Sequence, residues 1–220
     1  MAIEQEDFIL LKQIRTALLE ASPDIPREES CAILGDCHIH VGLETFKNQM
    51  QFDTVETFDI VGHPTHKVNL NELLDKSFYD KYDWIIDSGT LYCCFDVSTV
   101  FENITNMLKN KGVVVHTGNL SGFYGRGFYS ISPALFRDFY NCNNFTIETT
   151  ATKTRQTRTW KYFNYEDTYL ANRDLSFQRV AGEFVPEIPN DSMIFCCATR
   201  KERSPFKKPV PEHFINTDGK

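Results

Sequence analysis

The sequence predicts an α/β fold built on an open parallel β-sheet, and three observations in one stretch of the chain predict it. The apolar run Trp84 to Ile86 ends at Asp87, which is typical of a buried strand that enters a turn. An amphipathic segment follows, and after Gly112 comes a second apolar run, Val113 to His116. Strand, helix and strand in this order form one crossover unit of a parallel sheet, and such sheets bind ligands where their strands end. We therefore expect the function to reside near Asp87 and His116.

Composition predicts one globular domain that handles small molecules. The 220 residues are 41% hydrophobic and 13% aromatic, enough to form a sizeable core. The formal net charge of -7 argues against nucleic-acid and anionic-membrane partners, because phosphate groups are held by clustered cations. The acidic start MAIEQEDF lacks the cations of a secretory signal, and no apolar run is long enough to span a bilayer. We expect a cytoplasmic protein with a small-molecule acceptor, and a homodimer is left open.

The cysteine pattern predicts free thiols. Seven cysteines are present, including the adjacent pairs Cys93-Cys94 and Cys196-Cys197, and no two are spaced as CxxC. Adjacent cysteines in apolar runs usually behave as small hydrophobic residues. We therefore expect a reducing compartment and no bound metal.

The first half of the chain alternates between the two periodicities that distinguish strands from helices. The segment Glu4 to Ala21 has apolar residues at helical spacing and ends before Pro23, so it predicts a helix that packs on the domain or covers it. In chain order we then expect a strand at Cys31 to Leu34, a helix at Leu43 to Met50, a strand from Thr54 to Phe58 that ends in Asp59, a third strand and loop at His66 to Leu70, and a helix at Asn71 to Lys81.

The second half continues the alternation and then changes to strands. Asp96 is a suitable N-cap for a helix that would run to Gly112, and Ser132-Pro133 opens another that would end at Asn143. A glycine-rich aromatic loop, Gly118 to Tyr129, lies between them. The two closing strands are expected at Thr146 to Thr152 and Met193 to Thr199. We expect a single domain over 1–199, with 153–191 as an insertion or substrate cover and 200–220 as an extended tail.

Five short stretches, taken in order and spacing, carry a resemblance to a known family. They are Phe58-Asp59-Ile60, Val68-Asn69-Leu70-Asn71, Asp87-Ser88-Gly89-Thr90-Leu91, Met107 to Gly112, and Gly127 to Pro133. Through these residues the stretch from about Cys31 to Phe145 resembles class I S-adenosylmethionine-dependent methyltransferases. It resembles one branch of them that often occurs among enzymes that modify sugars and surface polysaccharides. The resemblance implies a Rossmann-like, seven-stranded, mostly parallel sheet flanked by helices, with an antiparallel last strand. It also implies S-adenosyl-L-methionine as cofactor and methylation of a hydroxyl or amine of a small polar acceptor, with sugars and nucleotide-sugars as examples.

The resemblance also implies a set of cofactor-binding residues. An acid that ends the second strand can accept hydrogen bonds from ribose hydroxyls, a glycine lets backbone approach a ligand, and an amide suits the adenine amine. The candidates are Gly35 and Asp36 at the methionine end, Asp59 and Ile60 at the ribose, Asn69 and Leu70 at the adenine, and Asp87, Ser88 and Gly89 as the pocket wall. Purely structural alternatives stay open for these residues: a helix cap for Asp59, a plain turn for Gly35 and Asp36, and an exposed loop amide for Asn69.

The candidate catalytic residues follow the strand that ends at His116. A neutral imidazole there could take a proton from an acceptor hydroxyl, and Arg126 and Tyr129 in the next loop could orient an acceptor, with the arginine suited to a carboxylate or phosphate. A structural histidine and loop aromatics used for packing are the alternatives.

The chain departs from the family pattern in two places. The glycine-rich turn after the first strand is reduced to Gly35-Asp36-Cys37, and Tyr92-Cys93 and Arg126 stand where the family generally carries an acid and histidines. These departures motivate an alternative function, namely a divergent protein that binds a nucleoside or a partner without methylating, or one that uses the same cofactor for non-methyl chemistry. A nicotinamide-dependent oxidoreductase is disfavoured because GxGxxG is missing after the first strand.

Overall fold

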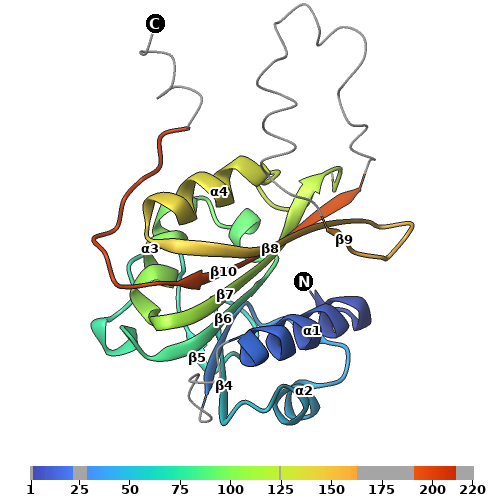
Figure 1. Ribbon diagram of the computed structural model, residues 1–220, viewed down its shortest axis with the longest axis horizontal. Coiled ribbons are helices and arrows are strands. Elements are labelled where there is room, and N and C mark those ends of the chain that lie inside the picture. Colours follow the sequence, from blue (N-terminus) through green and yellow to red (C-terminus); the bar gives the residue numbers. More distant parts are fainter. Residues whose placement is uncertain (1, 22–28, 124, 163–190, 212–220) are drawn as a thin grey trace, which may run out of the picture.

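The computed structural model describes residues 2–21, 29–123, 125–162 and 191–211, and it places helices on both faces of an eight-stranded sheet (Figure 1). The strands are β1 (Ala2–Ile3), β2 (Ser30–Leu34), β3 (His38–Ile39), β4 (Thr54–Asp59), β5 (His66–Lys67), β6 (Tyr82–Ser88), β7 (Leu108–Ser121), β8 (Phe145–Thr154), β9 (Lys161–Tyr162) and β10 (Ser192–Arg200). The helices are α1 (Gln5–Ala21), α2 (Leu43–Met50), α3 (Val97–Met107) and α4 (Pro133–Cys142), with 3₁₀ turns η1 (Lys76–Phe78) and η2 (Leu91–Cys93).

The strand order of the large sheet is β5-β4-β2-β6-β7-β10-β8-β9. Neighbouring strands from β5 to β7 pair in parallel, and β10 runs antiparallel to both β7 and β8. The predicted fold class, including the antiparallel last strand, is confirmed; the two-residue β9 adds an eighth strand. The chain builds outward from β2 to β5 and then returns to β6 on the other side of β2. This reversal puts the carboxyl ends of β2 and β6 side by side, and open sheets of this kind usually bind ligands at such a position.

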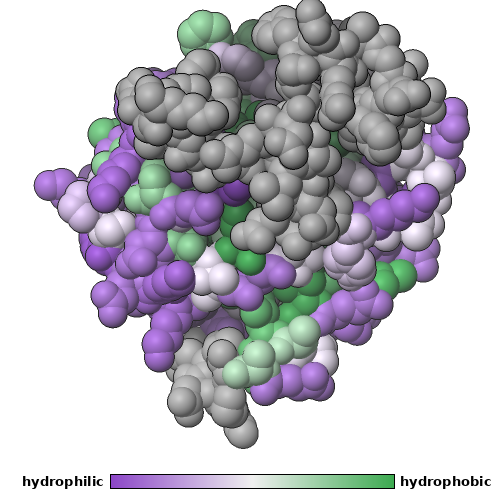
Figure 2. All heavy atoms as spheres, turned by 45° about the horizontal axis from the view of Figure 1, so that its top comes forward, coloured by the Kyte–Doolittle hydropathy of each residue, from purple (hydrophilic) through white to green (hydrophobic). Residues whose placement is uncertain are grey.

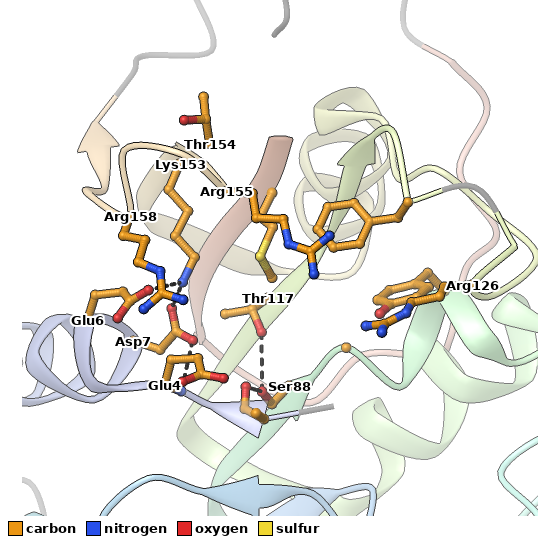
Figure 3. A pocket seen from close by; sticks show the side chains of 15 residues that line it. Glu4, Glu6, Asp7, Ser88, Thr117, Arg126, Lys153, Thr154, Arg155 and Arg158 are labelled. Atoms are coloured by element: carbon orange, nitrogen blue, oxygen red, sulfur yellow. Dashed lines mark hydrogen bonds and ion pairs between the residues drawn. The ribbon is translucent and has the colours of Figure 1, made fainter. Parts of the chain in front are cut away.

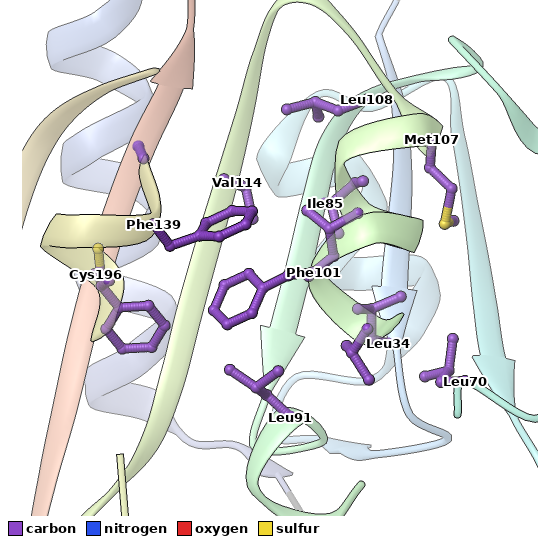
Figure 4. Packing of buried hydrophobic residues seen from close by; sticks show 14 of the residues in the cluster. Leu34, Leu70, Ile85, Leu91, Phe101, Met107, Leu108, Val114, Phe139 and Cys196 are labelled. Carbon is purple, nitrogen blue, oxygen red and sulfur yellow. The ribbon is translucent and has the colours of Figure 1, made fainter. Parts of the chain in front are cut away.

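Both faces of the sheet are apolar because side chains of each central strand alternate between two cores. Ile85 and Val114 face the core formed with α3 and α4 (Figure 4), whereas Trp84, Ile86 and Val115 face the core formed with α1 and α2. Phe101 of α3 and Phe139 of α4 meet over the first face with ring centroids 4.1 Å apart. Burial on both faces explains why the central strands appear in the sequence as continuous apolar runs.

The predicted helix caps form as the residue types suggest. The Asp96 carboxylate accepts a hydrogen bond from the Thr99 amide at 3.0 Å, and the Ser132 hydroxyl accepts one from the Ala134 amide at 3.3 Å. Pro133 occupies the first turn of α4. Each cap satisfies an amide that the first turn of a helix would otherwise leave open.

Two predicted elements are wrong, and the predicted loop Gly118 to Tyr129 is shorter than expected because its first four residues belong to β7. The segment Asn71 to Lys81 forms only the short turn η1, because the buried side chain of Asn103 holds its backbone in an irregular path. Gly112 does not end a helix: α3 stops at Met107 and β7 begins at the next residue. A Cβ at Gly112 would lie 2.8 Å from the Leu108 side chain, so the glycine is required by a close approach within the strand.

Hydrophilic residues dominate the described surface in Figure 2, as the high content of charged residues suggests. The described part of the tail, 201–211, runs without helix or strand but is fastened to the domain. The Lys207 amide donates to the Asn143 side chain at 2.8 Å, and Phe206 packs against the first core. Of the predicted cover, 153–191, the stretch 163–190 lies outside the described residues. No helix in the described ranges has the length and apolarity needed to cross a membrane.

Candidate functional site

The carboxyl ends of β2 and β6 are joined by the threonine of the predicted turn. The Thr90 hydroxyl donates to the Leu34 carbonyl at 2.7 Å and so joins the ends of the two strands. Gly35 follows with φ +103°, a conformation that favours glycine, and its amide donates to the Phe58 carbonyl at 2.7 Å. Three parallel strands therefore end at fixed relative positions.

The side chain of Asp87 is buried against this turn and is not exposed to solvent. Its side chain is 1% exposed, and Oδ1 accepts the amides of Thr90 and Leu91 at 2.7 and 3.1 Å. These bonds shape the backbone of Ser88 and Gly89, the two residues that do reach a cavity. The sequence prediction that Asp87 contacts the cofactor stays a prediction, and its hydrogen bonds favour a role in shaping the turn.

His116 is fully buried, with both ring nitrogens engaged. Nδ1 lies 2.7 Å from Asp87 Oδ2, Nε2 meets the Tyr140 hydroxyl, and the ring stacks on Phe136 at a centroid distance of 4.8 Å. A base must reach the proton that it removes. The catalytic role predicted for His116 stays a prediction, and this burial argues for a structural role.

Asp36 and Asp59 link the loops that follow the first two long strands. The Asp36 amide donates to Asp59 Oδ2 at 2.7 Å, and the His63 amide donates to Asp36 Oδ2 at 2.7 Å. Asp59 Oδ1 also accepts the amides of Ile60 and Val61. A carboxylate offers about four lone-pair directions, so Asp59 keeps capacity for one further donor such as a ribose hydroxyl. Ile60 is 56% exposed beside it.

The two residues predicted to flank adenine are differently placed. Asn69 bonds locally, with its side-chain oxygen accepting the Asn71 amide at 3.1 Å and its amide donating to Glu72 at 2.8 Å. Leu70 is 5% exposed and belongs to the hydrophobic core under α3. The geometry therefore gives Leu70 a packing role, and its contact with a nucleobase stays a prediction.

A cavity of about 260 Å³ opens beside the carboxyl ends of β6 and β7 (Figure 3). Ser88, Gly89 and Arg126 are the predicted site residues that line it. The rest of its wall comes from Ala2, Glu4, Glu6, Asp7, Tyr92, Thr117, Phe123, Lys153, Thr154, Arg155, Arg158 and Met193. Pockets for drug-sized ligands occupy about 300–1,000 Å³, so this cavity suits a smaller ligand.

One lysine pairs with two acids in the wall of the cavity. Lys153 is 5% exposed and pairs with Asp7, and its Nζ lies 3.4 Å from Glu6 Oε1. The Trp160 indole also donates to Asp7 at 3.0 Å. Burial raises the pKa of Asp7, whereas Lys153 acts to lower it. The start of α1 is thereby fastened to the end of β8.

The phenol of Tyr92, which lines the cavity, and the thiols of Cys37 and Cys94 are kept neutral. Burial, followed by neighbouring Cys93 and Asp87, raises the pKa of Tyr92, so its phenol keeps its proton near neutral pH. Burial raises the pKa of Cys37 to about 11 and that of Cys94 to about 12, which keeps both as thiols. In the part of the chain that the structure describes, no group of three or more potential metal ligands comes together.

The glycine-rich loop after β7 holds Tyr129 outside this cavity. The Tyr129 hydroxyl donates to the Phe95 carbonyl at 2.9 Å, and the side chain lines a second hollow of about 360 Å³ formed by residues of the loop itself. Arg126 lines both hollows. The predicted loop therefore divides, with Arg126 facing the cavity and Tyr129 at the rim of the second hollow.

Sequence reasoning missed two walls of the cavity. The N-terminal residues Ala2 to Asp7 were expected only as part of a helix that packs or covers, and Lys153 to Arg158 only as the start of an irregular insertion. The signals in the sequence were the acids that open α1 and the basic residues after β8. Neither signal shows that the two segments meet, because they are about 150 positions apart in the chain.

No protein-family model matches the sequence, and no curated protein sequence matches it. Solved structures do match. A provisionally assigned methyltransferase from Bacillus halodurans C-125 aligns with TM-score 0.54 and 10% identity over 89% of this chain and 99% of its own. The N-methyltransferase NodS from Bradyrhizobium japonicum WM9, solved with S-adenosyl-L-homocysteine, gives 0.52 and 11% over 91% of each chain. The CurJ carbon methyltransferase gives 0.51 and 12% over 90% of this chain and 56% of its own. At such identities the likeness establishes the fold.

Proposed function

We propose that this chain, whose fold is that of the class I S-adenosylmethionine-dependent methyltransferases, transfers a methyl group from S-adenosyl-L-methionine to a hydroxyl or amine of a small polar acceptor. The observation that carries the proposal is the position of Ser88 and Gly89. Ser88 ends β6 and Gly89 follows it, at the reversal of strand order, and both line the cavity. Sugars and nucleotide-sugars belong to the acceptor class that the sequence resemblance suggests.

Some residues at the carboxyl ends of β2 and β4 are suited to bind S-adenosyl-L-methionine. Gly35 offers backbone without a side chain at the end of β2, and Asp59 keeps room for one donor. We assign the methionine end to Gly35, Ser88 and Gly89, the ribose to Asp59 and Asp36, and the adenine to the exposed side of Ile60 and Asn69. When bound, the cofactor supplies an activated methyl group. The protein mainly supplies alignment, which can remove roughly 7 to 11 kcal/mol of barrier.

The chain's own groups account for the other requirements of the transfer. Tyr92 and Thr117, which carry hydroxyl groups, line the cavity, as do Glu4 and Glu6, whose carboxylates could accept a proton from an acceptor. Lys153 holds the wall that carries these carboxylates. We also propose a cytoplasmic location, supported by seven cysteines that are all free. We further propose one domain over 1–199.

Calorimetric titration with S-adenosyl-L-methionine and S-adenosyl-L-homocysteine tests the proposal. We expect saturable binding of both to the wild-type protein and binding at least about tenfold weaker for Asp59→Ala, because a charged hydrogen-bond acceptor is lost. Glu44→Ala removes an exposed acid from α2 and serves as the control. A wild-type protein that binds neither ligand would overturn the proposed function, and unchanged binding by Asp59→Ala would overturn the placement of the ribose.

A second candidate is a divergent protein that binds a nucleoside or a partner without methylating, or that uses the cofactor for other chemistry. The observation that favours it is the link between Asp36 and Asp59, which engages the polar groups usually left for a ligand. Incubation with donor carrying a labelled methyl group and a panel of sugars, nucleotide-sugars and amines separates the two functions. Transfer of the label supports the first function, whereas tight cofactor binding with no labelled product across the panel supports the second.

A further inference from the structure

The cavity has an uneven distribution of charge that the methyl transfer itself does not require. The chain carries a net charge of -7, yet Arg126, Arg155 and Arg158 all line this one cavity in addition to the paired Lys153. Within the described ranges no ion pair joins any of these three arginines to a carboxylate. Unpaired guanidinium groups gathered in a cavity are suited to bind an anion.

Two of the arginines face the same space. Figure 3 shows the guanidinium groups of Arg126 and Arg155 directed into the cavity beyond Thr117 and Ser88, whereas Arg158 projects on the side of Glu6 and Lys153. The Arg155 guanidinium also lies over the Phe123 ring, 5.8 Å from its centroid. A ring beneath the guanidinium limits its rotation and leaves the edge free to donate hydrogen bonds.

The loops that carry these arginines are joined by Asp191, the residue before β10. Its carbonyl accepts the Arg155 amide at 3.0 Å, and its Oδ1 accepts the Phe123 amide at 3.3 Å. Arg126 is positioned in turn, because its amide donates to the Phe123 carbonyl at 3.0 Å. The two arginines come from different segments, and Asp191 joins the backbones of these segments through its carbonyl and its side chain.

Tyr92 holds the loop that carries Arg126. The Tyr92 carbonyl accepts the amides of Phe128 and Tyr129 at 2.8 and 3.3 Å. A Cβ on Gly127 would lie 2.3 Å from the Tyr92 ring, so loop and ring are in close contact. The backbone that carries Arg126 is therefore positioned before any ligand arrives, which reduces the entropy lost on binding.

We propose that the acceptor carries an oxyanion, a carboxylate or a phosphate, and that Arg126 and Arg155 bind it as a pair. The anion sits at the arginine side of the cavity, and the part of the acceptor that receives the methyl group points toward Ser88 and Thr117. This inference rests on the proposed function and deepens it by naming the acceptor as an anionic molecule. Paired guanidinium groups hold an oxyanion through charge-assisted hydrogen bonds with defined geometry.

The test is calorimetric titration of the full chain at low ionic strength with inorganic phosphate in one arm and malonate in the other. We expect saturable binding in at least one arm, weakened at least about tenfold by Arg126→Gln and by Arg155→Gln. The arm that binds more tightly identifies the anion as phosphate or carboxylate.

Two matched variants separate a specific pair from general attraction. Arg158→Gln removes the same charge within the cavity, and Lys201→Gln removes one from an exposed site outside it. Both are expected to keep binding within about threefold, because Arg158 projects toward Glu6 and Lys153 and Lys201 does not line the cavity, so neither reaches the anion. No saturable binding in either arm, or an equal loss in all four variants, would overturn the inference.

Titration of the same proteins with S-adenosyl-L-homocysteine keeps the two proposals apart. The arginine variants should bind it as the wild-type protein does. A protein that binds the anion but not S-adenosyl-L-homocysteine would count against the proposed function alone. A protein that binds S-adenosyl-L-homocysteine but not the anion would count against the anion site alone.

Discussion

Asp87 Oδ2 and His116 Nδ1 lie 2.7 Å apart in the middle of the sheet, with side chains 1% and 0% exposed. The pair connects β6 to β7, and through Tyr140 it reaches α4. Asp87 also shapes the turn that brings Ser88 and Gly89 to the cavity. The buried hydrogen bonds of Asp87 and His116 therefore help to fix the backbone of the residues that line the cavity.

His116→Ala is expected to lower the free energy of unfolding by about 3 kcal/mol or more, because a buried carboxylate loses its partner and a void remains. Urea unfolding followed by circular dichroism measures it, with the exposed His38→Ala as control. A variant with wild-type stability and a 10²-fold or larger loss of methyl transfer would instead identify His116 as a base, since bases contribute about that much.

Lys153→Met is expected to destabilise the protein by about 3–5 kcal/mol, because the buried Asp7 carboxylate loses its cation. Replacing both residues, with Asp7→Leu added, should recover most of the loss. In the single variant the pKa of Asp7, already raised above 3.8 by burial, should rise further because Lys153 no longer lowers it. A raised folded pKa gives stability that is present below 3.8 and lost as pH rises.

Unfolding of Lys153→Met and of the wild-type protein at several pH values between 4 and 8 tests the direction in which stability changes with pH. The variant should lose stability relative to the wild-type protein as pH increases. A difference between the two proteins that stays constant over this range would show that Asp7 remains ionised.

Gly127→Ala is expected to displace the loop that carries Arg126, because the new Cβ would clash with Tyr92 in a backbone conformation of φ +71°. Gly125→Ala is the matched control, since Gly125 has φ +79° and nothing lies within 4 Å of its Cβ position. The control should show only the left-handed strain, roughly 1–2 kcal/mol. Anion titration should show weaker binding for Gly127→Ala than for Gly125→Ala, and equal binding would contradict the close packing.

Glu56→Gln should flatten the dependence of stability on acid pH. Burial acts to raise the pKa of Glu56, but hydrogen bonds from Lys81, Tyr82 and His66 outweigh it and lower the pKa from 4.5 to about 2. A depressed folded pKa gives stability that is present above 4.5 and lost as pH falls from 4.5 to 2. Thermal unfolding across this range compares the variant with Glu44→Gln, an exposed control that should keep the wild-type slope.

Asn103→Ala should destabilise the protein by roughly 2–4 kcal/mol, because three buried hydrogen bonds to the backbone are lost. The Asn103 side chain accepts the Leu74 amide at 2.9 Å and donates to the carbonyls of Leu70 and Glu72 at 3.2 and 2.8 Å. Asn110→Ala, at an exposed position of β7, is the control. Chemical denaturation that finds the two variants equally stable would contradict this role.

Asn103 also shows what sequence periodicity cannot predict. The spacing of Leu73, Leu74 and Phe78 is compatible with a helix, yet a side chain about 30 positions away supplies the hydrogen bonds that a helix would have made. Local patterns did predict the central strands and the caps at Asp96 and Ser132, because these depend on neighbours in sequence.

The candidate site was predicted only in part for the same reason. Ser88, Gly89 and Arg126 follow strands, so their edge of the sheet could be predicted from the chain order. The burial of His116 depends on Tyr140 and Phe136 of α4, and the arrangement of Arg155 depends on Asp191. Such contacts are set by tertiary packing.

The N-terminal strand has a practical consequence for experiments. Ala2 lines the cavity, and its carbonyl accepts a hydrogen bond from the Ser88 hydroxyl at 2.9 Å. An affinity tag joined ahead of Ala2 would begin beside the very residues whose ligands are to be measured. Purification handles for the titrations above therefore belong at the C-terminus, or should be cleaved off completely before any ligand is added.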